Sequence, residues 1–131
     1  MAIDYVARAR ALVGTRFRPQ GRGDGGLDCI GVLLMTFGIA PELVRRDYKL
    51  RAEHNLAALR NALQHHFRRV PRTQLRPGDA MLLLAGKQQP HLAVRTGGGF
   101  VHAHAGVGRV VETPGDPKWP LLGVYRKRRG C

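Results

Sequence analysis

The stretch "GGLDCIGVLLMTFGI" (residues 25–39) opens on two glycines, continues with Asp28 and Cys29, and ends in a nearly unbroken apolar run. The glycines indicate a loop. The apolar residues from Cys29 to Phe37 predict a buried helix that Gly38 ends. We therefore expect Cys29 in the first turn of a buried helix, directly after a loop.

A thiol at the start of a helix lies near the positive end of the helix macrodipole and near N–H groups without helical partners. Both features favour an anion, so we expect a lowered pKa for Cys29. The same N–H groups can form an oxyanion hole, and Gly31 would leave room for a substrate chain. The alternative is that Cys29 is a small buried hydrophobic residue, as most free cysteines are.

The length and cysteine content indicate one small domain. The chain has 131 residues, of which 44% are hydrophobic, and this suits one compact core over residues 1–131. Its two cysteines, Cys29 and the terminal Cys131, form neither a disulfide framework nor a paired-cysteine zinc motif. We therefore expect Cys29 to be a free thiol.

The sequence shows no obvious export or membrane segment. The first residues, "MAIDYVARARALVG" (residues 1–14), mix charged and apolar side chains and lack the apolar stretch of a secretory signal. The longest apolar run, from Ile30 to Ala40, is too short to span a membrane. We therefore expect synthesis in the cytoplasm without a signal peptide, and no membrane span.

The charge is strongly positive. Twenty-two Lys and Arg residues stand against nine Asp and Glu, a net charge of +13, which favours an anionic partner unless the surface is merely basic. No helix-turn-helix, zinc-finger or aromatic RNA-binding signature occurs. Nucleic acid therefore ranks below an acidic polymer or an acidic protein. We expect residues 126–131, "RKRRGC", to form a short basic tail.

The order of the expected elements indicates the fold class. Apolar spacing predicts helices over 3–13 and 53–67 and a short helical turn over 41–46, with a loop over 15–26. Proline and glycine before an acid predict a turn at Leu75–Asp79. Short apolar segments separated by Gly or Pro then predict strands at 80–85, 91–96, 99–105, 108–113 and 121–127. We expect an α+β domain in which N-terminal helices pack on a small antiparallel sheet.

Histidines on the expected strands supply candidate bases. Three of the six histidines (His54, His65, His66) fall on the polar helix, where we expect them to face solvent. His91 and His102 flank a predicted hairpin with Gly97–Gly99 at its turn, which would bring them close. A nucleophilic thiol needs a base and a third group that orients the base. The two strand histidines can fill both roles.

A zinc site is the second chemical interpretation. His102 and His104 point to the same face of a strand, and with His91 they could form a three-histidine centre. Only Glu112 supplies a carboxylate nearby, and such a site would leave Cys29 unexplained. We therefore expect no metal and no cofactor.

Four sequence blocks resemble the NlpC-type cell-wall peptidases, which are papain-like cysteine enzymes. The blocks are "ARALVGTRFRPQGRGDGGLDCIGVL", "LRPGDAMLL", "HLAVRTGGGFVHA" and "VVETPGDPKWPLLGVYR". The resemblance implies the papain-like NlpC-type fold and cleavage of the peptidoglycan stem, typically between D-glutamate and diaminopimelate. The site residues that it implies are Cys29 as nucleophile, His91 as base, His102 (or, alternatively, His104) as orienting residue, and Asp28, Phe17 and Gly31 in the oxyanion and substrate loop.

Two departures qualify the resemblance. Ile30 stands where the family has serine after the nucleophile, and Phe17 stands where a tyrosine hydroxyl is common and so donates no hydrogen bond. The "DCIG" and "FRPQ" motifs are similar to the branch encoded by phages, prophages and gene transfer agents. That similarity implies a particle component, with peptidoglycan and tail-tip or baseplate proteins as partners. The alternatives are a non-catalytic subunit of a phage-like tail that retains the fold, and an amidase or acyl transferase.

Overall fold

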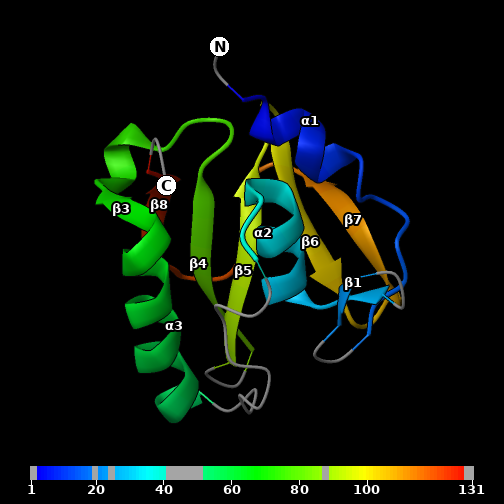
Figure 1. Cartoon of the computed structure of the whole chain (residues 1–131), viewed down its shortest axis with the longest axis horizontal. Helices are drawn as coiled ribbons and strands as arrows, with labels where there is room; N and C mark the ends of the chain where they lie inside the picture. The colour runs from blue at the N-terminus through cyan, green and yellow to red at the C-terminus, as the bar shows by residue number, and fades with distance from the viewer. Residues whose placement is uncertain (1–2, 19–20, 24–25, 41–51, 87–88, 129–131) are drawn as a thin grey trace.

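The computed structural model describes residues 3–18, 21–23, 26–40, 52–86 and 89–128 as helices packed on an antiparallel sheet (Figure 1). In chain order the elements are α1 (Tyr5–Arg10), β1 (Arg22–Gly23), β2 (Gly26–Leu27), α2 (Cys29–Phe37), α3 (Ala52–His66), β3 (Phe67–Val70), the 3-10 helix η2 (Arg72–Gln74), β4 (Ala80–Ala85), β5 (Gln89–Arg95), β6 (Gly99–His104), β7 (Arg109–Pro114) and β8 (Leu121–Lys127). The expected α+β class is confirmed.

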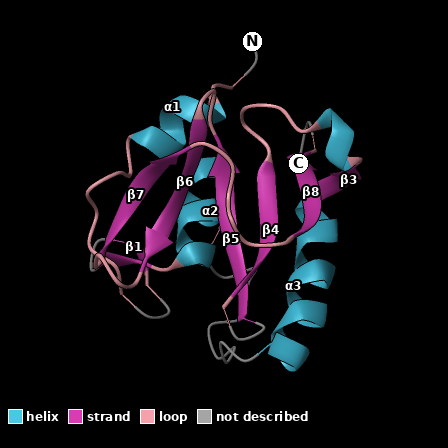
Figure 2. Cartoon of the chain, turned by 180° about the vertical axis from the view of Figure 1, so that it is seen from behind, coloured by secondary structure: helices cyan, strands magenta, loops and turns pink. Residues whose placement is uncertain are grey.

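The main sheet has the strand order β3-β8-β4-β5-β6-β7, and every pairing in it is antiparallel. The helices lie on one face, as the two opposite views show (Figures 1 and 2). The main core lies between α2, α3 and this face, where alternate strand residues such as Leu82, Leu92 and Val101 are buried. A smaller cluster lies on the other face, around Met81 and Phe100.

Helix α2 is the centre of the fold because nearly all of it is buried. Among its residues only Met35 is exposed. Asp28 caps its start, where the carboxylate accepts a hydrogen bond from the Gly31 amide at 2.7 Å. Gly38 ends it in the left-handed conformation at φ 67°. These bounds are the predicted ones, since both the apolar run and the terminating glycine can be recognised in the sequence.

Other elements differ from the prediction. The first helix ends at Arg10 rather than residue 13. The loop over 15–26 contains the small β1–β2 hairpin. Phe67 begins strand β3 instead of ending the helix. The five predicted strands are confirmed as β4 to β8; β4 and β8 have the predicted bounds, and the ends of the other three are shifted by at most two residues. The predicted turn over 41–46 lies outside the described residues.

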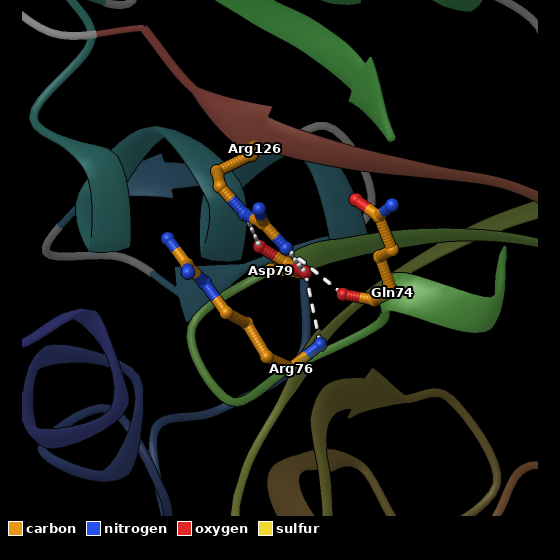
Figure 3. A network of polar contacts seen from close by, with 4 residues as sticks. All are labelled: Gln74, Arg76, Asp79 and Arg126. Atoms are coloured by element: carbon orange, nitrogen blue, oxygen red, sulfur yellow. Dashed lines mark hydrogen bonds and ion pairs between the residues drawn. The ribbon is translucent and has the colours of Figure 1, made fainter. Parts of the chain in front are cut away.

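A buried ion pair fastens the predicted Leu75–Asp79 turn to β8 (Figure 3). Asp79 is 1% exposed, and both of its carboxylate oxygens accept hydrogen bonds from Arg126 at 2.8 Å. The Arg76 amide also donates to this carboxylate, and Arg126 donates to the Gln74 carbonyl. Because Arg126 belongs to β8, the predicted tail over 126–131 is wrong in its first residues, and the sheet continues to Lys127.

The β5–β6 hairpin is confirmed, but its three glycines are not equivalent. The Thr96 amide donates to the Gly99 carbonyl and closes the turn. A Cβ at Gly97 or Gly98 would meet open space, whereas one at Gly99 would lie 2.1 Å from the Thr113 carbonyl oxygen. Gly99 therefore belongs to the sheet, where β6 approaches β7 closely.

No helix in the described part of the chain combines the length and the apolar character that a membrane crossing needs.

Candidate active site

The candidate site lies where strands β5 and β6 separate. β5 pairs with β6 only at Val94 and Arg95, opposite Val101 and Phe100. The earlier part of β5 therefore has no strand partner on that side, and α2 packs against it. The backbone at Leu92 hydrogen-bonds the Cys29 sulfur. The start of α2 thus places the thiol beside the residue that follows His91.

His91 and His102 form a hydrogen-bonded pair across this separation. His91 Nε2 lies 2.9 Å from His102 Nδ1, and the two rings are nearly perpendicular, at 88°. His102 is 2% exposed, whereas His91 is partly exposed. The predicted proximity of the two histidines is therefore confirmed. Because His91 uses Nε2 toward His102, Nδ1 is the ring nitrogen that His102 leaves unused.

The hydrogen bonds to the Cys29 sulfur come from the backbone, at Leu92, Ile30 and Cys29 itself. No direct hydrogen bond joins the sulfur to either imidazole in this structure. In substrate-free enzymes such bonds are often long and tighten only when the substrate binds. The structure therefore brings the thiol next to the base-bearing strand without joining the two groups.

The expected lowering of the thiol pKa is wrong for this structure. Burial raises the pKa of Cys29 to about 12, with a further rise from the adjacent Asp28 carboxylate, and the backbone hydrogen bonds oppose only part of this effect. Desolvation disfavours the charged thiolate more than the start of the helix favours it. The resting site thus holds a neutral thiol.

The two imidazoles are also neutral. Burial lowers the pKa of His91 to about 3, and the positive forms of His102 and His104 lower it further. Burial and His104 lower the pKa of His102 to about 4. At neutral pH each ring therefore carries one N–H and one acceptor nitrogen. A thiolate would form here by proton transfer to an uncharged His91.

The residues expected in the oxyanion and substrate loop have structural partners. The Gly31 amide donates to Asp28 and is therefore occupied. A Cβ at Gly31 would lie 2.2 Å from the Gly21 carbonyl oxygen, so the space expected there for substrate is already filled by the loop. Phe17 is partly buried against the main core, and its amide donates to the Gly108 carbonyl. A substrate contact by Phe17 stays a prediction.

His104 occupies a different environment from His102. Its Nδ1 accepts a hydrogen bond from the Val107 amide in the β6–β7 turn, at 3.1 Å. The rings of His102 and His104 lie 5.6 Å apart, whereas His102 bonds His91 directly. The geometry thus favours His102 over His104 as the orienting residue.

The zinc interpretation does not fit this geometry. His91 and His102 direct nitrogens at each other instead of at a shared point. Within the described ranges, no group of three or more histidine, cysteine or acidic side chains is arranged to hold a metal ion.

The remaining histidines lie on α3 instead of on the strands of the sheet. His65 is exposed as expected, but His66 is partly buried, and burial lowers its pKa. The side chain of His54 is outside the described residues.

Sequence reasoning missed Thr113 and Trp119. Thr113 Oγ1 lies 3.0 Å from His102 Nε2. Trp119 packs edge-on against both imidazoles, with ring centroids 5.2 Å from His91 and 5.9 Å from His102. A regular spacing could have revealed Thr113, because His91, His102 and Thr113 are each 11 residues apart on successive antiparallel strands.

The sequence of the chain is similar to a curated bacterial enzyme. It is 30% identical over 109 residues to the murein DD-endopeptidase MepS/murein LD-carboxypeptidase of Escherichia coli strain K12. The match covers 81% of this chain and 51% of that protein, so the chain spans about half the length of the curated relatives it matches. No family model matches the sequence.

Solved structures share the fold at lower sequence identity. NlpC1 from Trichomonas vaginalis superposes with a TM-score of 0.67 and 15% identity, over 94% of this chain and 42% of that one. RipD from Mycobacterium tuberculosis, described as a non-catalytic NlpC/p60 domain protein, superposes with a TM-score of 0.57 and 16% identity, over 96% and 95%. The chain therefore has the NlpC/P60 fold.

Proposed function

We propose that the protein is a cysteine peptidase that hydrolyses peptidoglycan stem peptides. The observation that carries this proposal is the His91–His102 pair, held at 2.9 Å beside the strand position that hydrogen-bonds the Cys29 sulfur. Cys29 is the one cysteine within the described residues, it is a free thiol, and it begins the buried helix α2. A nucleophile, a base and an orienting group thus come from three neighbouring elements.

In the proposed reaction His91 removes the thiol proton as the Cys29 sulfur attacks the scissile carbonyl carbon. The backbone amides of Cys29 and Ile30 face the sulfur and would stabilise the negative oxygen. His91 then protonates the leaving amine, and the acyl group stays on the sulfur. Water, deprotonated by His91, hydrolyses the thioester and restores the thiol. His102 orients His91 throughout.

We propose the bond between D-glutamate and diaminopimelate as the target, on the sequence resemblance. The E. coli relative is named for two other cleavages in murein, a DD-endopeptidase and an LD-carboxypeptidase activity. The three bonds yield fragments of different mass, so the products identify the bond.

The test incubates purified sacculi with the wild-type protein and determines the masses of the released muropeptides. Cys29→Ala should release nothing above background, whereas Cys131→Ala, the matched control at the other cysteine, should release the same fragments as wild type. Equal release by wild type and Cys29→Ala would contradict catalysis by this thiol.

A non-catalytic structural or binding role is the second candidate function. RipD shows that the fold occurs in a non-catalytic protein described as adapted to peptidoglycan binding, and the thiol here lacks a direct bond to His91. Sedimentation of the wild-type protein with sacculi, without release of fragments, would favour this role.

We further propose that the protein is carried on a phage or gene-transfer-agent tail particle. The "DCIG" motif at residues 28–31 and the net charge of +13 support the proposal, since a basic protein can dock on acidic tail proteins. Quantitative mass spectrometry of purified particles from the source organism should find a fixed number of copies per particle. Finding none would remove the tail role.

A further inference from the structure

The hydrogen-bonded pair continues one step beyond His102, to a side chain on the next strand. His102 Nε2 lies 3.0 Å from Thr113 Oγ1, and His102 Nδ1 lies 2.9 Å from His91 Nε2. Thr113 stands on β7, diagonally across from His102, because its direct partner in the register is Phe100. Both nitrogens of the buried His102 are therefore engaged, one on each side.

We propose that Thr113 is a positioning residue that fixes which nitrogen of His102 carries the proton, and thereby makes Nδ1 of His91 the proton acceptor. This inference rests on the proposed function. Thr113 touches neither the thiol nor the scissile bond in the proposed reaction, and it acts only through the two rings.

The direction of the hydrogen bonds follows from what a base requires. To take the thiol proton at Nδ1, neutral His91 must carry its own proton on Nε2 and donate it to His102 Nδ1. Neutral His102 must then carry its proton on Nε2 and donate it to Thr113 Oγ1. Both rings are neutral at pH 7, because burial lowers the pKa of His91 to about 3 and of His102 to about 4.

The reverse direction gives an inactive site. If His102 carried its proton on Nδ1, it would donate to His91 Nε2, and His91 would then hold its proton on Nδ1. Nδ1 of His91, the nitrogen that His102 does not use, could then not accept another proton. The Thr113 hydroxyl can accept from a protonated His102 Nε2, and its loss penalises this active arrangement most, because a buried N–H without an acceptor costs more than an acceptor nitrogen without a donor.

Thr113 is the hydrogen-bond partner of His102 on the Nε2 side of the ring. The His102 ring is 2% exposed and lies against Phe100 and Trp119, with ring centroids at 4.7 and 5.9 Å. Neither neighbour offers an oxygen to an N–H donor. Loss of the threonine hydroxyl would leave a buried N–H without an acceptor, which is costly, and the proton would move to Nδ1.

The test compares Thr113→Val, which keeps the shape and removes the hydroxyl, with Thr113→Ser, which keeps the hydroxyl. Thr73→Val, at an exposed position in η2, is the matched control. On soluble peptidoglycan fragments Thr113→Val should lower kcat about 10- to 100-fold with little change in KM. Thr113→Ser and Thr73→Val should stay within about 3-fold of wild type, since neither removes the acceptor.

The ring 15N chemical shifts of His91 and His102 in the free protein supply a second readout. In wild type and Thr113→Ser both rings should carry their proton on Nε2, and in Thr113→Val both should shift toward Nδ1. This measurement needs no substrate, so it decides the inference even if the wild-type protein proves unable to hydrolyse peptidoglycan. Unchanged shifts in Thr113→Val, or a kcat loss that serine does not restore, would overturn the proposal.

Discussion

Two buried polar clusters lie toward opposite ends of the β4–β5 strand pair, and they are built differently. At one end the Asp79 carboxylate is bonded by the Arg126 guanidinium and the Arg76 amide, so its charge is fully paired (Figure 3). Toward the other end, opposite Leu83, His91 belongs to a chain of uncharged groups. One of its nitrogens is not used by His102. A paired charge holds the fold together, whereas an unused acceptor is available for chemistry.

Replacing the base should give the largest effect and should leave the fold intact. His91→Gln removes the proton acceptor for Cys29, so we expect activity to fall about 10³-fold or more. Hydrolysis rates on soluble fragments measure the loss, and circular dichroism with a melting curve checks the fold. A variant that keeps wild-type activity would remove His91 from the mechanism.

Replacing the paired carboxylate of Asp79 should lower the stability of the fold and leave the activity unchanged. Asp79→Asn leaves the Arg126 guanidinium beside a neutral amide, so we expect the free energy of unfolding to fall by about 2–4 kcal/mol. Activity per folded molecule should stay close to that of wild type. Urea denaturation gives the first quantity, and assays well below the melting temperature give the second. A selective loss of activity would show that the two clusters are coupled.

Lowering the pH should destabilise the protein first through protonation of the uncharged cluster around His91. The pKa values of His91 and His102, about 3 and 4, lie below the ordinary value of 6.5. As the pH falls from 6.5 toward these values, the unfolded chain therefore binds more protons than the folded one. Stability is therefore present above pH 6.5 and is lost as the pH falls toward 4. Scanning calorimetry should find a melting temperature several degrees lower at pH 5 than at pH 7.

The control for the acid experiment is His102→Gln, which should flatten the pH dependence. An unchanged slope would mean that other groups cause the loss.

The smallest effect is expected at an exposed ion pair of the same chemistry. Arg95 and Asp116 also lie 2.8 Å apart, but the Asp116 side chain is 82% exposed, against 2% for Asp79. Water already solvates this carboxylate, so Asp116→Asn should change the free energy of unfolding by less than about 1 kcal/mol. Urea denaturation beside Asp79→Asn makes the comparison direct, and equal losses would refute the role given to burial.

Local signals explain which parts of the fold could be predicted. The bounds of α2 follow from its apolar run and the terminating Gly38, and the β5–β6 hairpin follows from its glycines. Strand β3 was missed because Phe67 stands four residues after Leu63 and so continues the apolar spacing of the helix. Its two arginines gave no strand pattern.

Properties set by tertiary packing could not be predicted in the same way. The pKa of Cys29 depends on how completely α2 and β5 exclude water from the sulfur, and position at the start of a helix does not reveal this. The partner of His102 depends on the register of β6 against β7, which places Thr113 diagonally across. The proximity of His91 and His102 could be predicted from the sequence, but the protonation of these rings and their contacts with Thr113 and Trp119 could not.

The unequal glycines of the β5–β6 turn determine where the molecule can be labelled. A fluorophore or an affinity tag inserted between Gly97 and Gly98 enters open space, at the far end of the hairpin from His91. At position 99 even one methyl group would push against the Thr113 carbonyl and displace the strand that carries the hydroxyl. A reporter could thus follow this hairpin during substrate binding, provided that the third glycine is left untouched.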